Sequence, residues 1–400
     1  MAMSSVSSSA RNNGLIYFDN AATSHPKPPE VAASVSSFIN EIGASPGRSG
    51  HRLSIEAGRV VFEAREIAAA LFNAPDPMRV SFGLNATDAL NLAIKGVLRP
   101  GDHVVTGGME HNSVMRPLRD MERRGVQLSV APASPDGTLD PADIRKALRP
   151  NTRLVALNHA SNVTGVAAPI REVGRFCSES GTLFLVDAAQ TAGCFPLDMQ
   201  ADFIDLLAFT GHKALLGPQG TGGLVVGGRV KLDEFATLKQ GGTGSRSEFE
   251  THPDFAPDMF EAGTPNTAGI AGLLAGLSFV SGETVKKIHA RDAALTARLI
   301  SRLKEVPRLR IIGEAPGSPR TATVSFVIDG LSPSEIGLIL DEEFCILCRV
   351  GLHCAPAAHK TVGSFPDGSV RFGLGYFNTE EQIDFAASAL KEIAMRRGGF

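Results

Sequence analysis

Two short apolar runs near the middle of the chain constrain its fold more than any other feature. They span Leu183–Val186 and Phe203–Phe209, are rich in branched and aromatic residues, and are bounded by Gly, Pro or Asp. Runs of this length predict strands buried on both faces, which is typical of a parallel sheet. Strand and helix patterns alternate from residue 79 to residue 226, so we expect an α/β fold with a mostly parallel sheet.

Both runs lead into residues that can carry chemistry. The first is followed by Asp187, and the second leads into Thr210, His212 and Lys213. Taken singly, the Asp would be a helix cap and the Lys a solvated residue. Ligands of open α/β sheets bind outside the carboxyl ends of the strands, so we expect both side chains at one edge. Pyridoxal phosphate (PLP) needs this pair, because a lysine forms a Schiff base with its aldehyde and an aspartate pairs with its protonated pyridine nitrogen.

The motifs VDAAQTAG (186–193) and FTGHKALLGPQGTG (209–222) resemble the class V aminotransferase family of fold type I PLP enzymes, in its cysteine desulfurase and selenocysteine lyase branch. The resemblance extends from Asp19 to about Thr379. It implies a large domain with a mostly parallel seven-stranded sheet and a smaller α/β domain, and a chain of 400 residues is long enough for two lobes. We expect residues 1–24 to join the small domain, residues 25–265 to form the large PLP-binding domain, and residues 266–400 to form the small C-terminal domain.

The resemblance places the cofactor phosphate on Ala86 and Thr87. Thr87 follows a predicted strand at 79–82 and is suited to be the N-cap of a helix that runs to residue 98. Helix N-termini bind phosphate because they present free N–H groups and a partial positive charge. In the family, Gly263 and Thr264 of the motif FEAGTPNT reach the phosphate of the neighbouring subunit, which implies a homodimer with two shared active sites.

His111 follows the next predicted strand, at 103–106. Such a His is usually a cap or a surface residue, but in the family it stacks on the pyridine ring and moves protons, as a flat group that titrates near neutrality can. The resemblance assigns Asn162 to the phenolic oxygen of the cofactor and to the substrate carboxylate. The residues predicted to bind the cofactor are Ala86, Thr87, His111, Asn162, Asp187, Gln190, Thr210, His212, Lys213, Gly263 and Thr264.

Cys354 lies in the motif RVGLHCAP (349–356), a loop bounded by Gly and Pro after a predicted strand. A cysteine is most often a buried small hydrophobe, but basic and His neighbours in a loop predict an exposed, activated thiol. By resemblance, this thiol takes the sulfur of PLP-bound cysteine as a persulfide, and alanine leaves. Leu352 stands where the common family pattern has a first His before His-Cys.

The substrate carboxylate is predicted to bind Asn162, Arg349 and Arg371. Arg371 lies in a strand-like run, and a fixed guanidinium binds a carboxylate through two hydrogen bonds. Without the resemblance, it would be interpreted as a surface Arg on an edge strand.

The sequence therefore predicts a PLP-dependent cysteine desulfurase that converts L-cysteine to L-alanine, with Lys213, His111 and Cys354 as catalytic residues and a sulfur acceptor protein as a partner. Selenocysteine lyase is the nearest alternative, followed by a transaminase or epimerase in which Cys354 is incidental, and by a PLP-binding scaffold without catalysis. The missing glycine fingerprint disfavours a nicotinamide dehydrogenase.

Composition argues against other classes. A net charge of −3 and the lack of Trp give no support for nucleic acid or membrane partners. Five scattered cysteines favour a reducing compartment, and residues 1–13 lack the apolar core of a signal peptide, so we expect a cytoplasmic protein. Cys345 and Cys348 form a CxxC pair, but on an extended strand they would point to opposite faces, and we predict no metal site. The Gly-rich segment 241–247 is expected to be a flexible loop.

Overall fold

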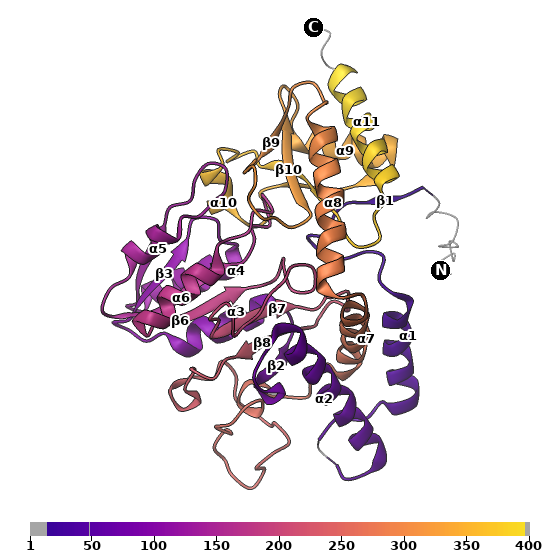
Figure 1. Ribbon diagram of the computed structural model, residues 1–400. Coiled ribbons are helices and arrows are strands. Elements are labelled where there is room, and N and C mark those ends of the chain that lie inside the picture. Colours follow the sequence, from indigo (N-terminus) through magenta and orange to yellow (C-terminus); the bar gives the residue numbers. More distant parts are fainter. Residues whose placement is uncertain (1–13, 48, 397–400) are drawn as a thin grey trace, which may run out of the picture.

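A seven-stranded sheet forms the centre of the larger lobe in the computed structural model, which describes residues 14–47 and 49–396 (Figure 1). Its strand order is β2-β8-β7-β6-β5-β3-β4. All neighbouring strands are parallel except the two pairs that β8 makes with β2 and β7. The strands are β2 (Val80–Gly83), β3 (His103–Gly107), β4 (Gln127–Ala131), β5 (Thr152–Asn158), β6 (Leu183–Asp187), β7 (Leu206–Thr210) and β8 (Gly222–Val226). The mostly parallel seven-stranded sheet expected from the sequence is confirmed.

Helices cover both faces of this sheet, which explains why its central strands are apolar throughout. Val105 and Val186 pack toward α2, α6 and α7 on one face, and Val104 and Leu185 pack toward α3 and α4 on the other. The helices around the sheet are α1 (Pro29–Ser37, continued by a π-helical turn at Phe38–Ile42), α2 (Arg52–Phe72), α3 (Ala86–Val97), α4 (Asn112–Arg123), α5 (Pro141–Ala147), α6 (Ile170–Ser180) and α7 (Thr267–Glu283). Single 3₁₀ turns lie at Pro77–Arg79, Leu232–Glu234 and Asp258–Phe260.

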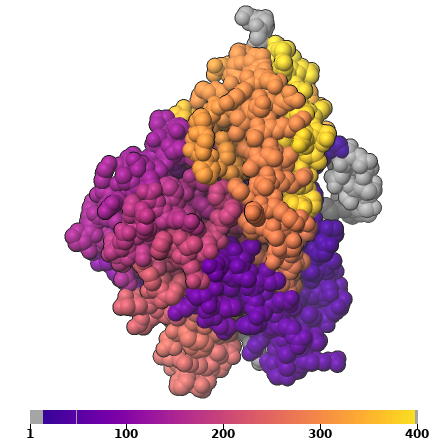
Figure 2. Space-filling model, viewed as in Figure 1, coloured from indigo at the N-terminus to yellow at the C-terminus, as the bar shows by residue number. Residues whose placement is uncertain are grey.

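The smaller lobe contains an antiparallel sheet in the order β12-β13-β10-β9. Figure 2 shows this lobe, in orange and yellow, in contact with the indigo to magenta part of the large lobe. Its strands are β9 (Leu309–Ile312), β10 (Thr323–Ile328), β12 (Arg349–Gly351) and β13 (Ser369–Gly373), and its helices are α8 (Val285–Leu303), α9 (Pro333–Phe344), α10 (Pro356–Thr361) and α11 (Glu380–Arg396). The N-terminal β1 (Ile16–Tyr17) pairs in parallel with β11 (Ile346–Leu347).

The predicted domain boundaries stay predictions, but two contacts bear on them. The pairing of β1 with β11 attaches the first described residues to the small lobe. Helix α7, which the predicted boundary assigns to the small domain, contributes Ile270, Leu273 and Leu277 to the core of the large sheet.

Two predicted strands differ from the structure. The run predicted at 203–209 forms a strand only from Leu206, because Phe203 has a left-handed backbone (φ 55°) in the turn that precedes β7. The sequence predicts a single strand at 345–350. In the structure it begins at Ile346, because Cys345 is the left-handed C-cap of α9 (φ 54°), and it is divided at Cys348 into β11 and β12.

No single helix in the described ranges is both long and apolar enough to cross a membrane. Helices α7 and α8 meet the length and composition criteria only as a pair, and this pair is bent by 80°.

Candidate active site

The carboxyl ends of β5, β6 and β7 meet at one cavity of about 200 Å³. Asp187 is the last residue of β6, Thr210 is the last residue of β7, and Lys213 follows three residues later. The predicted convergence of the carboxylate and the lysine is therefore observed. The cavity is lined by Asn85, Ala86, Thr87, His111, Ser113, Asn158, Ala160, Asn162, Asp187, Ala189, Gln190, Thr210, His212 and Lys213.

Burial changes the proton affinities of the two central charged groups in opposite directions. Burial lowers the pKa of Lys213 to about 8, and the charge of Asp187 opposes this decrease. Burial raises the pKa of Asp187, against the hydrogen bond from the Ala189 N–H (2.9 Å) and the charge of Lys213. The lysine therefore reaches its neutral, nucleophilic form closer to neutral pH than an ordinary lysine does.

His111 lines the same cavity and is also the N-cap of α4. Its Nδ1 accepts the Ser113 N–H at 3.1 Å and lies 3.0 Å from the Ser113 Oγ. Burial, followed by the charge of Lys213, lowers the pKa of His111 to about 4. Because Nδ1 is an acceptor, the ring is neutral at pH 7 with its proton on Nε2.

Ser113 connects His111 to Thr87, whose Oγ1 lies 2.8 Å from the Ser113 Oγ. Ser113 was not among the predicted site residues, although its position two residues after His111 on a helix start is a signal for such a contact. The predicted N-cap of α3, Thr87, is wrong. Asn85 caps this helix by accepting the Asp88 N–H at 3.0 Å, which leaves the Thr87 hydroxyl exposed in the first turn.

The lining fits a polar cofactor, because three of its buried polar atoms have no hydrogen-bond partner within the described chain. They are the Asn162 Oδ1, the Thr210 Oγ1 and the His212 Nδ1. Buried polar atoms are costly without a partner. The phosphate, phenolic oxygen and ring nitrogen of PLP are groups that such atoms, with Thr87 and Asp187, can bind.

Nine of the eleven predicted cofactor residues lie in this lining. The other two, Gly263 and Thr264, are exposed outside it, and the Gly263 N–H donates to the Gly242 carbonyl at 2.9 Å. Their predicted role depends on a second subunit and stays a prediction. Gln190 also holds the N-terminal segment, since its Nε2 donates to the Ala21 carbonyl at 3.1 Å.

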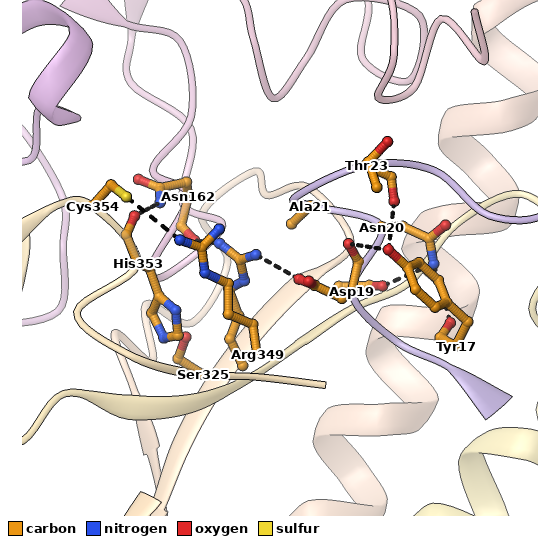
Figure 3. Close-up of polar contacts among 12 residues, drawn as sticks. Tyr17, Asp19, Asn20, Ala21, Thr23, Asn162, Ser325, Arg349, His353 and Cys354 are labelled. Carbon is orange, nitrogen blue, oxygen red and sulfur yellow. Dashed lines mark hydrogen bonds and ion pairs between the residues drawn. The ribbon is translucent and has the colours of Figure 1, made fainter. Parts of the chain in front are cut away.

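The small lobe adds Cys354 in a strained but anchored loop after β12 (Figure 3). His353 and Cys354 both have left-handed backbones (φ 49° and 58°), which are unfavourable for residues with a Cβ. Two contacts from the large lobe hold them: the Asn162 Nδ2 donates to the His353 carbonyl at 2.7 Å, and the Asn112 N–H donates to the Cys354 carbonyl at 2.9 Å. The side chain of Cys354 is exposed, and the Arg349 Nη2 lies 3.4 Å from its Sγ.

Arg371 is on the central strand β13 and is 1% exposed, so the alternative of a surface Arg on an edge strand is wrong. Its Nη1 donates to the Asn162 carbonyl at 3.1 Å, and its Nη2 pairs with the Asp19 Oδ1 at 2.8 Å. The resemblance to the family implied that the motif Asp19-Asn20-Ala21-Ala22-Thr23, which follows the first apolar run of the chain, lines the active site, but the pairing of Asp19 with Arg371 was not predicted.

Cys345 and Cys348 do not lie on one extended strand, because Cys345 is a helix cap. Burial raises the pKa of Cys348 to about 12, so its thiol is protonated at neutral pH. Within residues 14–47 and 49–396, no group of three His, Cys, Asp or Glu side chains is placed to hold a metal ion.

Comparisons with known proteins agree with this geometry. The aminotransferase class-V family model matches residues 16–385. A probable cysteine desulfurase of Methanothermobacter thermautotrophicus is 34% identical over 385 residues, which cover 95% of this chain and 94% of the relative, and one of Streptomyces coelicolor is 34% identical over 391 residues, covering 95% and 92%. An apo structure of a cysteine desulfurase from Thermococcus onnurineus superposes with a TM-score of 0.89 at 31% identity over 96% of both chains. A second, from Escherichia coli, has a TM-score of 0.84 at 27% identity and covers 97% of this chain and 96% of the other. The chain belongs to the aminotransferase class-V family.

Proposed function

We propose that this protein is a PLP-dependent cysteine desulfurase that converts L-cysteine to L-alanine and takes the sulfur onto Cys354. The observation that carries the proposal is the placement of an exposed thiol, held on a fixed backbone beside Arg349, next to the cavity that contains Lys213 and Asp187. The names of the relatives support the same reaction.

When bound, PLP supplies an aldehyde that holds the substrate amine and a cationic ring that draws electrons from the substrate. Asp187, at the end of β6, is the carboxylate that keeps such a ring protonated. Lys213, whose pKa is about 8, accepts and returns the α-proton at its Nζ. Neutral His111 has a hydrogen-bond donor at its Nε2. Arg371 binds the α-carboxylate of the substrate.

Cys354 acts as the nucleophile toward the substrate sulfur. Its thiolate forms the new S–S bond while the C–S bond of the substrate breaks. The electron pair of that bond stays with the β-carbon, which takes up a proton as alanine forms. The Arg349 Nη2, 3.4 Å from the Cys354 Sγ, can donate a hydrogen bond to this sulfur.

The partners and the location of the protein belong to the same proposal. Gly263 and Thr264 are exposed and free to meet a second subunit, which supports a homodimer with shared sites. The persulfide on an exposed thiol needs an acceptor, and a sulfur acceptor protein is the partner that this chemistry requires. All five cysteines are free, which supports a reducing, cytoplasmic location.

Alanine formation by matched cysteine variants tests the proposal. The purified chain supplied with PLP should show a visible absorbance band and produce equimolar alanine and sulfide from L-cysteine with a reductant. Cys354→Ala should keep the band and lose alanine formation, whereas Cys345→Ala, which removes another exposed thiol of the small lobe, should keep both. The absence of a band after PLP is added would contradict the proposal. Alanine formation from selenocysteine that survives Cys354→Ala would favour selenocysteine lyase instead.

A further inference from the structure

Arg371 is a buried cation whose hydrogen-bonding capacity is only partly used. One Nη donates to a backbone carbonyl, that of Asn162, and the other pairs with the Asp19 carboxylate. Its Nε is buried and has no partner within the described chain. Among the described residues, Asp19 is thus the only carboxylate in an ion pair with this guanidinium. It lies 352 residues away from Arg371 in the sequence.

The backbone around Asp19 is fixed to the strand that carries Arg371. Asp19 forms an isolated bridge with Gly373, the Asn20 N–H donates to the Gly373 carbonyl (3.0 Å), and the Gly373 N–H donates to the Phe18 carbonyl (2.7 Å). A Cβ on Gly373 would lie 2.7 Å from the Ala21 nitrogen, so this close approach requires glycine. The Asp19 carboxylate that contacts Arg371 is therefore carried by a fixed backbone, and Figure 3 shows Asp19 with its neighbours.

The charges around this pair indicate what the arrangement is for. Burial is the main cause of the lowered pKa of Lys213, and the nearby Arg371 and Arg349 guanidinium groups lower it further, while the charges of Asp187 and Asp19 raise it. A buried guanidinium without a carboxylate would be strongly unfavourable. A second carboxylate, that of an amino acid, can use the donors that Asp19 leaves free, because a guanidinium has five N–H groups.

We propose that Asp19 is a positioning residue for substrate recognition: it fixes the guanidinium of Arg371 through one Nη and so presents the remaining donors, Nε among them, to the α-carboxylate of the amino acid substrate. This inference rests on the proposed function, which makes that carboxylate the ligand of Arg371. Asp19 acts through Arg371 and takes no part in sulfur transfer.

Three substitutions separate positioning from charge. Asp19→Asn keeps an oxygen that accepts the Nη, Asp19→Glu keeps the charge but moves it by one methylene, and Asp19→Ala removes both. The matched control is Asp384→Asn, which removes a carboxylate from the half-buried Arg298 and Arg302 pairs elsewhere in the small lobe. Positioning predicts that KM for L-cysteine stays within about threefold in Asp19→Asn and rises about tenfold or more in Asp19→Ala and Asp19→Glu, with kcat changed much less.

A second measurement uses the full chain before cofactor is added, so it does not depend on turnover. The pH dependence of Lys213 acylation, followed by mass spectrometry, should move to lower pH in Asp19→Asn and stay unchanged in Asp384→Asn, because the first variant removes a negative charge near the amine. This readout distinguishes failure of the inference from failure of the proposed function.

The inference is overturned if KM is impaired in Asp19→Asn and normal in Asp19→Glu, which would assign the effect to charge alone. It is also overturned if all Asp19 variants that fold keep the wild-type KM, or if Lys213 acylation in Asp19→Asn follows the wild-type pH curve. Should Asp19→Ala not fold, the order of the Asn and Glu variants decides the question.

Discussion

Removing the amide of Asn162 should release the loop that carries Cys354. The Asn162 Nδ2 donates to the His353 carbonyl at 2.7 Å, and both groups are buried. Asn162→Ala loses this hydrogen bond and leaves a buried carbonyl without its donor, which costs about 1–3 kcal/mol. The left-handed backbones of His353 and Cys354 each favour opening by about 1–2 kcal/mol in the wild type and the variant alike, so they do not change the difference between the two. We expect the opening equilibrium to shift by about 2 kcal/mol, or roughly 30-fold.

Hydrogen exchange at the Asn112 amide measures this opening directly, because this amide donates to the Cys354 carbonyl at 2.9 Å. Its exchange in the full chain without cofactor should be roughly 30-fold faster in Asn162→Ala than in the wild type. Ser325→Ala is the matched control, since the Ser325 Oγ donates to the Val163 carbonyl (2.6 Å) next to Asn162 but does not hold the Cys354 loop.

Two results would refute this reasoning. If Asn112 exchanges at the wild-type rate in a folded Asn162→Ala chain, the amide does not hold the loop closed. If Ser325→Ala accelerates the exchange equally, the effect comes from general loosening of the interface between the lobes.

Three further perturbations test individual residues of the two lobes. Burial lowers the pKa of Lys213 to about 8, so its acylation in the cofactor-free chain should rise with pH and level off above about 8; a rate that still climbs toward about pH 10, as for an ordinary lysine, would contradict this. Burial raises the pKa of Asp292 from 3.8 to about 7, so the stability it contributes is complete below about pH 4 and lost as pH rises through 7. Chemical denaturation should therefore find Asp292→Asn more stable than the wild type above pH 7, by up to roughly 4 kcal/mol. If the difference in unfolding free energy between the two proteins is the same at about pH 4 as above pH 7, the effect is excluded. Gly373→Ala places a Cβ 2.7 Å from the Ala21 nitrogen and should lower the free energy of unfolding by about 1–3 kcal/mol in the same assay; a normal value would show that the turn can move.

The strand ends of the large lobe could be predicted because their signal is local. Asp187 and Lys213 each follow an apolar run of a buried strand, and parallel strands bring such ends to one edge without further information. The N-cap of α3 was predicted wrongly because Asn85 and Thr87 are both good capping residues two positions apart. Only the hydrogen bond from the Asp88 N–H to Asn85 distinguishes them.

The contacts that were not predicted join distant parts of the chain. Asp19 meets Arg371 across 352 positions, and Ser113 meets Thr87 across 26. Neither apolar periodicity nor motif spacing contains such a distance. The burial of Arg371 could not be predicted from the sequence either, because a strand with mixed polarity is equally compatible with an edge and with the centre of a sheet.

The anchoring of the Cys354 backbone explains how one thiol can serve two reactions. A sulfur-transferring cysteine has to reach the substrate in the cavity and afterwards meet an acceptor outside it. The backbone carbonyls of His353 and Cys354 are both bonded to the large lobe, while the thiol itself is exposed and contacts only Arg349 among the hydrogen bonds of the described residues. The lobes thus fix the backbone from which the exposed thiol projects. The two hydrogen bonds from the large lobe are what stabilise the unfavourable left-handed backbone of His353 and Cys354.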